Sequence, residues 1–285
     1  MTKTYEQIVD LVANTLVEAG STFRDDKKAA YRRAIEKESS ERAKWVLETI
    51  LENAEAAEKN RSPLCDDTGI PHLVLEIGEN QAISGKTLDA IKEGVKQGLR
   101  KLPGRPMGIM GNDSMRIDQS GGLDPDSAGV EPAPILLRRC KEDVIRLHIL
   151  MFGGGPAIRG KTYRIFHKHS TAVVLDEIVN WAQEAVAQLG CSPCTLAVGI
   201  GRSHFEAASM MLQAQTDGDY GVQSDMEREI TERVNAANIG PLGLKGDTSV
   251  IATFMKVGPQ RASGVRVVCL RPTCCFEPRI ATVEL

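Results

Sequence analysis

Residues 61–72 read RSPLCDDTGIPH and place one thiol directly before two carboxylic acids. Cys65 offers a thiolate, the form of cysteine that attacks substrates and binds metal ions. Asp66 and Asp67 add two carboxylates, and charges of one sign this close together repel each other unless a cation or hydrogen-bond donors compensate them. The Thr-Gly pair that follows is typical of a turn. The stretch therefore requires a neutralising group.

The chain contains seven cysteines, an odd number that does not suit a disulfide framework in a protein of 285 residues. Apart from Cys140, each follows a helix end, a strand or a turn, and they form three groups: Cys65; Cys191 and Cys194; Cys269, Cys274 and Cys275. Such edges can direct thiolates at a shared point, as iron–sulfur and zinc sites require. Cys140 has no motif around it, and we expect a small buried side chain there. The spacing of Cys191 and Cys194 is that of a metal knuckle, but a single pair does not support a zinc ribbon.

A glycine-rich segment, GGGPAIRGK, follows the expected strand 144–152. Gly155 to Thr162 nearly match the phosphate-binding pattern G-x-x-x-x-G-K-[ST]. The next residues, YRIFHKHS, are β-rich, whereas a phosphate loop must open a helix whose backbone N–H groups hold the anion. We therefore reject a nucleotide-binding loop. Consecutive glycines still allow backbone N–H groups to approach an anion closely, and Lys161 adds positive charge.

The surrounding elements follow from hydrophobic periodicity and from capping residues. We expect a helix from about residue 4, further helices over 26–37, 40–60, 85–101, 171–189, 203–215 and 224–238, and strands over 72–78, 144–152, 195–201, 250–257 and 264–270. Residues 102–134 are rich in Gly, Pro, Asp, Asn and Ser, which is typical of a functional loop, an interface or disorder. The pattern predicts an α+β fold with a helix-rich N-terminal part and a mixed β-sheet.

Composition excludes several classes of protein. The net charge of −3 argues against a nucleic-acid-binding protein, which would carry a basic excess or a basic stripe. No run of about 18 apolar residues predicts a membrane span. The N-terminus is amphipathic and lacks the unbroken apolar stretch of a secretory signal, so we expect a cytoplasmic protein.

Several motifs in one order resemble the α (N-terminal) part of the iron–sulfur hydro-lyases of the class I fumarase and L-tartrate dehydratase type. They are PLCDDTG, GGG followed by Gly-Lys, a helix ending at Gly190-Cys191-x-Pro193, VGIG, NIGPLGLKGDTSV, and a late Cys followed by an aromatic residue and an Arg. The resemblance covers residues 5–285 and implies the fold of that α domain. It predicts a single domain over 1–285, with a helical segment over 1–60 and a cluster-binding core over 61–285.

The resemblance implies a 4Fe–4S cluster that three cysteines hold and whose fourth iron is open to substrate. The implied ligands are Cys65, Cys191 and Cys275, with Cys274 as the alternative third ligand. Asp67 matches an Asp that positions the substrate or handles a proton. The implied substrate-binding residues are Asp66, Arg105 (with Arg100 as the weaker match), Gly154, Gly155, Lys161 and Arg279. The implied substrate is a small dicarboxylic or hydroxy acid.

The chain departs from the family pattern at several positions. Asp66 stands where the family typically has Gln, Phe276 stands where it has Trp, and the family's His upstream of the third Cys is missing. An added carboxylate would repel fumarate, which predicts a hydro-lyase for a different hydroxy acid or a paralogue that has lost activity. The family's C-terminal β part is absent, so the resemblance implies a separate β-type subunit in a hetero-oligomer or dimer. The alternative is a non-catalytic structural or sensor protein that binds zinc or a cluster.

Overall fold

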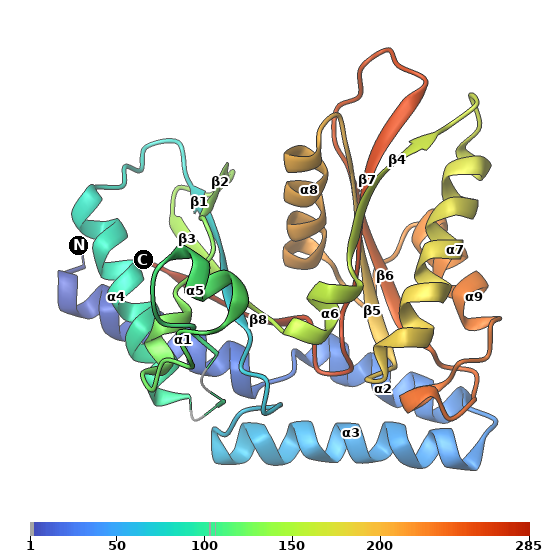
Figure 1. Cartoon of the computed structure of the whole chain (residues 1–285), viewed down its shortest axis with the longest axis horizontal. Coiled ribbons are helices and arrows are strands. Elements are labelled where there is room, and N and C mark those ends of the chain that lie inside the picture. The colour runs from blue at the N-terminus through green and yellow to red at the C-terminus, as the bar shows by residue number, and fades with distance from the viewer. Residues whose placement is uncertain (1–2, 103, 106) are drawn as a thin grey trace. The chain divides into compact units, whose positions relative to one another are not determined.

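The computed structural model describes residues 3–102, 104–105 and 107–285 of the chain (Figure 1). Its helices are α1 (Tyr5–Ser21), α2 (Asp25–Lys37), α3 (Glu41–Asn60), α4 (Gly85–Lys101), α5 (Asp113–Asp118), α6 (Gly154–Arg159), α7 (Thr171–Leu189), α8 (His204–Asp217) and α9 (Asp225–Asn235), with 3-10 turns η1 (Ser127–Val130) and η2 (Pro241–Gly243). Its strands are β1 (Ile70–Ile77), β2 (Leu136–Arg139), β3 (Ile145–Phe152), β4 (Lys161–Phe166), β5 (Cys194–Gly201), β6 (Val250–Val257), β7 (Val265–Pro272) and β8 (Arg279–Glu284).

The chain divides into two compact units, each built from separate segments of sequence. The first unit comprises Met1–Phe23, Ala54–Gly154 and Arg279–Leu285, and the second comprises Arg24–Asn53 and Gly155–Pro278. The single domain over 1–285, with its segments 1–60 and 61–285, stays a prediction.

The first unit has a four-stranded sheet in the order β2-β1-β3-β8. β1 is parallel to β2 and antiparallel to β3, and β8 pairs antiparallel with β3. Apolar residues of α1 and α4 form one core with the inward-facing residues of the strands, such as Leu75 and Ile149. Gly94 and Gly98 allow the two helices to approach closely, because a Cβ on Gly94 would lie 2.6 Å from Cβ of Val12. These glycines weaken α4 as an isolated helix but serve its packing.

The second unit has a four-stranded sheet in the order β4-β7-β5-β6, in which only β5 and β6 are parallel neighbours. Helices α7 and α9 cover one face and α8 covers the other (Figure 1). β5 is buried along its whole length, which explains its continuous run of small and apolar residues.

The predicted α+β class is confirmed, and within the described residues the strands form two mixed sheets. Helix α7 has the predicted bounds because Ser170 caps its first turn and Gly190 follows its end with a positive φ of 76°. The segment 102–134 contains α5 and η1, and β2, β8 and α6 were not predicted from the sequence. No helix in the described part of the chain is long and apolar enough to cross a bilayer.

Candidate functional site

The register of the first sheet brings three chain segments together at one end of its strands. Ile70, at the start of β1, pairs with Phe152 at the end of β3. Arg279, at the start of β8, pairs with Met151. The loop before β1, the turn after β3 and the first residue of β8 therefore meet, although more than 200 residues separate the first from the last in the sequence.

Asp67 lies at this end of the strands, and its two carboxylate oxygens are in different environments. Oδ2 accepts a hydrogen bond of 2.8 Å from the backbone N–H of Gly154. Oδ1 is buried and has no hydrogen-bond partner among the described residues. Buried polar atoms in folded proteins are nearly always paired, and an unpaired one calls for a specific explanation such as a ligand or a catalytic role.

Arg279 fixes the loop that carries Asp67. Its side chain is 2% exposed. Its Nη1 donates to the carbonyl oxygen of Asp67 at 2.7 Å, and its Nε donates to the carbonyl oxygen of Met151 at 3.2 Å. The guanidinium thus joins the loop before β1 to the end of β3 through backbone atoms. Within the first unit Arg279 is a positioning residue for Asp67, and direct substrate binding by it stays a prediction.

Gly69 is required for this arrangement. Its φ of +85° lies in the left-handed region, where residues with a side chain are strained. A Cβ at this position would lie 2.6 Å from Nη2 of Arg279 and 2.7 Å from the carbonyl oxygen of Phe152. The structure assigns no turn to Thr68 and Gly69, contrary to the expectation from sequence, and the glycine is required because the backbone passes directly against the buried guanidinium.

Asp66 and Arg105 form an ion pair. Oδ2 of Asp66 lies 3.1 Å from Nη1 of Arg105, and their side chains are 74% and 53% exposed. The backbone N–H of Arg105 also donates to the carbonyl oxygen of Asp66 at 3.1 Å. Arg100, the weaker match, instead pairs with Asp126 at 2.6 Å. The guanidinium of Arg105 is therefore the group that neutralises Asp66 in the segment 61–72. The ion pair also links Arg105 to the loop of Asp67.

The second unit gathers Cys191, Cys274 and Cys275, which we call the cysteine group. The backbone N–H of Cys275 donates to the carbonyl oxygen of Cys191 at 2.8 Å. The adjacent Cys274 thiol, together with burial and the thiol of Cys191, raises the pKa of Cys275 well above its ordinary value. Cys191 is exposed, Cys274 is half-buried and Cys275 is buried. These thiols therefore sit close enough to influence one another.

Cys194 and Cys65 differ from this group. Burial in β5 raises the pKa of the Cys194 thiol, which makes it a core side chain rather than a ready ligand. Cys65 is half-buried in the loop of the first unit, two residues before Asp67. None of the seven cysteines, all of which lie in the described part of the chain, forms a disulfide, and Cys140 is half-buried rather than fully buried as expected.

Two buried polar side chains of α2 hold the chain around Cys275. Tyr31 donates its hydroxyl to the carbonyl oxygen of Cys275 at 2.7 Å. Lys27 donates its ammonium to the carbonyl oxygen of Glu277 at 2.8 Å, and its side chain is 1% exposed. Nη1 of Arg271 meets the buried carboxylate of Glu277 at 2.5 Å. Sequence reasoning missed these residues, although a lysine within an apolar helix face would have been a signal.

The motif NIGPLGLKGDTSV folds against the loop that carries Cys191. Ser192 donates its hydroxyl to the carbonyl oxygen of Gly240 at 2.7 Å, and the N–H of Leu242 donates to the carbonyl oxygen of Ser192 at 3.0 Å. Glu38, at the end of α2, accepts hydrogen bonds from the backbone N–H groups of Asp247 and Thr248. The motif thus supports the backbone of the loop that carries Cys191.

The remaining predicted residues are Gly155 and Lys161 in the second unit. Gly155 has open space where a Cβ would stand. Lys161 begins β4 and places its ammonium 5.1 Å from the centre of the Trp181 ring, in a cation–π contact. Gly155 to Thr162 lead into the strand β4 and not into the start of a helix, as their β-rich sequel predicted.

Residues 9–284 match the family model described as fumarate hydratase (Fumerase). The chain belongs to this family. A protein of Methanocaldococcus jannaschii provisionally named L(+)-tartrate dehydratase subunit alpha is 29% identical, over 96% of both chains. The L(+)-tartrate dehydratase subunit alpha of Escherichia coli K12 is 21% identical, over 97% of this chain and 90% of its own. A provisionally named class I fumarate hydratase of Geobacillus stearothermophilus is 27% identical, over 90% of this chain but only 50% of its own.

Membership of the fumarate hydratase family confirms the prediction of a hydro-lyase. The relatives named as α subunits have the length of this chain, whereas the Geobacillus protein is about twice as long. The resemblance stated from the motifs is therefore confirmed. The roles of individual residues are not tested by these similarities and stay predictions.

The thiols of this fumarate hydratase family member suit an iron–sulfur cluster in their chemistry, since such clusters bind cysteine thiolates. Cys191 is exposed and has Cys274 and Cys275 as neighbours, so donor atoms are available at one place in the second unit. Among the described residues, no three His, Cys, Asp or Glu side chains already form a metal-binding group. The ligand set of Cys65, Cys191 and Cys275 or Cys274 accordingly stays a prediction.

Proposed function

We propose that this chain is the α subunit of a 4Fe–4S-dependent hydro-lyase. The reaction is the reversible addition or removal of water in a small dicarboxylic or hydroxy carboxylic acid. Family membership supports the reaction class, and relatives of matching length named as tartrate dehydratase α subunits support the subunit type. The departure at Asp66 favours a hydroxy-acid substrate related to tartrate over fumarate itself.

The observation that carries the proposal is the unpaired oxygen of Asp67. The N–H of Gly154 donates to Oδ2 of Asp67, and Arg279 donates to the backbone carbonyl oxygen of Asp67. The carboxylate therefore has one orientation. Oδ1 is left without a hydrogen-bond partner among the residues that the structure describes. A carboxylate held in this way can take a proton from the carbon next to a substrate carboxylate, or return one. We assign this proton transfer to Oδ1 of Asp67.

Arg105 is proposed to bind a carboxylate of the substrate. A guanidinium binds planar carboxylates through paired N–H donors. Because Asp66 already pairs with Arg105 at an exposed position, a substrate carboxylate replaces one weak ion pair with another. Gly154 and Gly155 leave room for the substrate to approach the backbone, and Lys161 and Arg279 complete the proposed substrate-binding residues.

Cys65, Cys191 and Cys275 are the proposed cluster ligands, with Cys274 as the alternative to Cys275. When bound, a cluster with one open iron supplies a Lewis acid for substrate carboxylate and hydroxyl oxygens. The hydrogen bonds of Ser192 to Gly240 and Leu242 keep the backbone of Cys191 in place before any ligand binds. The hydrogen bond from Tyr31 does the same for Cys275. Holding ligands in this way lowers the ordering cost of assembly.

A separate β-type subunit is part of the proposal, giving a hetero-oligomer or dimer in the cytoplasm. The support is the naming of two relatives as α subunits and the double length of the Geobacillus relative. Seven cysteines without a disulfide among the described residues agree with a reducing compartment.

The test is turnover by anaerobically prepared protein, co-expressed with a β-type hydro-lyase subunit from the same organism. L(+)-tartrate, L-malate, fumarate and short hydroxy monocarboxylates serve as substrates. We expect dehydration of at least one hydroxy acid, and we expect Asp67→Asn to lower kcat by about 100-fold or more at unchanged iron content. Asp118→Asn, an exposed acid on α5, is the matched control and leaves kcat unchanged. Wild-type turnover by Asp67→Asn would refute the assignment, and a fully loaded complex that turns over none of these acids would refute the function.

A further inference from the structure

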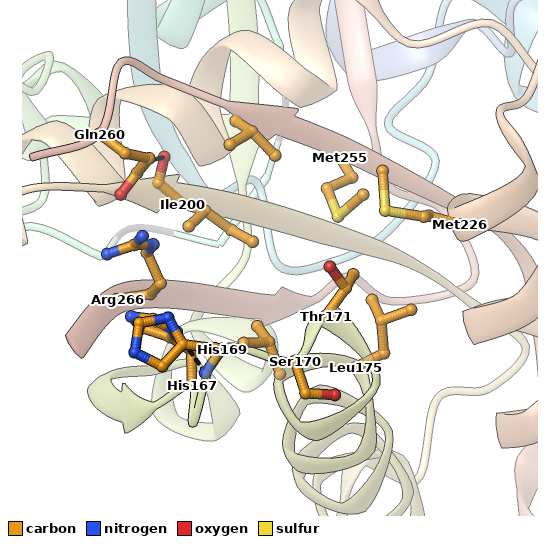
Figure 2. A pocket seen from close by; sticks show the side chains of 12 residues that line it. His167, His169, Ser170, Thr171, Leu175, Ile200, Met226, Met255, Gln260 and Arg266 are labelled. Carbon is orange, nitrogen blue, oxygen red and sulfur yellow. Dashed lines mark hydrogen bonds between the residues drawn. The ribbon is translucent and has the colours of Figure 1, made fainter. Parts of the chain in front are cut away.

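The second unit contains a cavity that the proposed reaction does not use. It has a volume of about 310 Å³ and lies at the end of β5 opposite Cys194, where Ile200 forms part of its wall. All of its lining residues belong to the second unit. Figure 2 shows that Arg266 and the two imidazole rings of His167 and His169 gather at one side. The other side holds apolar side chains, so the cavity is amphipathic.

Arg266 offers a paired set of donors at the polar side. Its Nη1 donates to the carbonyl oxygens of Ser263 at 3.1 Å and Val265 at 3.0 Å. Its Nε and Nη2 donate to no protein acceptor in the part of the chain described here. These two nitrogens share one edge of the guanidinium, and that edge binds the two oxygens of a carboxylate. The internal bonds of Nη1 hold the group without using this edge.

The two histidines have different roles beside Arg266. Nδ1 of His167 accepts a hydrogen bond of 3.0 Å from the backbone N–H of His169, so Nε2 carries the proton that is donated to the carbonyl oxygen of Ser263 at 2.7 Å. Both nitrogens of His167 are therefore used within the protein. The ring of His169 lies edge-on to His167 with centres 5.2 Å apart and makes no hydrogen bond among the described residues. It is available as a further donor to an anion.

Without a ligand, the apolar side chains of the cavity are in contact with water. Leu175 and Ile200 are buried around it, whereas Met226 is 38% exposed and Val257 is 50% exposed. Met255 completes this side, and flexible methionine side chains adapt to ligands of irregular shape. Covering these groups with an apolar ligand removes hydrocarbon surface from water, which favours binding.

We propose that this cavity binds an organic acid that has one carboxylate head and a short apolar body. The carboxylate meets Nε and Nη2 of Arg266 with His169 beside it, and the apolar body lies against Met226, Met255 and Leu175. An unsubstituted hydroxy acid such as tartrate lacks the apolar body, so the ligand class differs from the proposed substrate. The site and the proposed reaction are independent, because binding is measured without turnover.

The test uses the full chain with methyl-labelled methionines, in which Met226 and Met255 report on the cavity by NMR. Hexanoate is the probe, hexan-1-ol has the body without the head, and acetate has the head without the body. We expect hexanoate to shift the Met226 and Met255 methyl signals saturably, with a Kd of about 1 mM or tighter. Hexan-1-ol and acetate should bind at least about tenfold more weakly, because each forfeits one of the two contacts.

Variants distinguish recognition of the carboxylate by Arg266 from nonspecific hydrophobic binding. Arg266→Gln should weaken hexanoate binding about tenfold or more, and His169→Gln by a smaller factor, while Arg42→Gln on the exposed face of α3 should leave it unchanged. Unshifted signals of the other methionines establish that each variant is folded. Equal binding of hexanoate and hexan-1-ol, wild-type affinity in Arg266→Gln, or unshifted Met226 and Met255 signals would each overturn the proposal.

Discussion

Nη1 of Arg105 lies 3.1 Å from Oδ2 of Asp66, the first of the two acids that follow Cys65. The pair explains how the chain tolerates two neighbouring carboxylates beside a thiol, because Arg105 compensates one of them. It also means that the proposed carboxylate-binding group already has a carboxylate partner. Substrate therefore competes with Asp66 for the same guanidinium.

Asp66→Asn tests this competition. Both side chains are more than half exposed, and exposed ion pairs contribute about 1 kcal/mol at most. We expect the KM for a hydroxy dicarboxylic acid to fall by up to about fivefold, with kcat within about twofold of the wild type. Steady-state kinetics of the assembled enzyme measure both. The gain should be absent when Arg105 is also changed to Gln, and a raised KM in Asp66→Asn alone would contradict the competition.

Gly69→Ala tests how tightly the Asp67 loop is packed. A side chain at a φ of +85° is strained, and the new Cβ would lie 2.6 Å from Nη2 of buried Arg279. Gly122 is the matched control, since it has a φ of +75° and nothing within 4 Å of its Cβ position. We expect Gly122→Ala to cost about 1 kcal/mol of unfolding free energy and Gly69→Ala about 3 kcal/mol or more. Urea unfolding measures both, and equal costs would show that contact with Arg279 is unimportant.

His148 gives the first unit a dependence on pH. Its side chain is 11% exposed on β3, with Nδ1 2.8 Å from Oγ1 of Thr282 and Nε2 3.4 Å from a carboxylate oxygen of Glu76. Burial lowers the pKa of His148 below its ordinary value, and this outweighs the opposing effect of Glu76, which Arg138 and Arg146 also neutralise.

The sign of the pH effect follows from this lowered pKa. As pH falls through about 6.5, the unfolded chain takes up a proton at His148 while the folded chain resists it, so stability falls. The urea midpoint should therefore decrease from pH 7.5 to pH 5.5. It should decrease less in His148→Gln, which keeps a polar side chain without this titration. A larger decrease in the variant would mean that the folded protein favours the charged imidazole.

Local signals in the sequence were sufficient for most helices and for the central strands. α7 has strong periodicity with Ser170 and Gly190 at its ends, and β5 has an unbroken apolar run, so each is specified by its own residues. β8 is not, because its polar residues Arg279, Thr282 and Glu284 follow no regular alternation, and only its pairing with β3, about 130 residues earlier, identifies it as a strand. Long-range pairing of this kind leaves little trace in the segment itself.

The site was predictable in its residue types but not in its contacts. Cys65 and Asp67 stand out by their motif. The partners of Asp67, however, come from the end of β3 and the start of β8, and only sheet register brings them together. Lys27 and Tyr31 were missed for a related reason, since their hydrogen bonds to the turn after Thr273 cross about 245 residues of sequence.

Iron and sulfide analysis of the anaerobically reconstituted chain tests the central claim most directly. We predict about four irons and four sulfides per wild-type chain, with a brown colour, and a large loss of both in Cys65→Ser and Cys191→Ser. Cys140→Ser, at a half-buried thiol outside the proposed ligand set, should retain the full content. Zinc at about one per chain without iron, or an unchanged cluster in Cys65→Ser, would contradict the account.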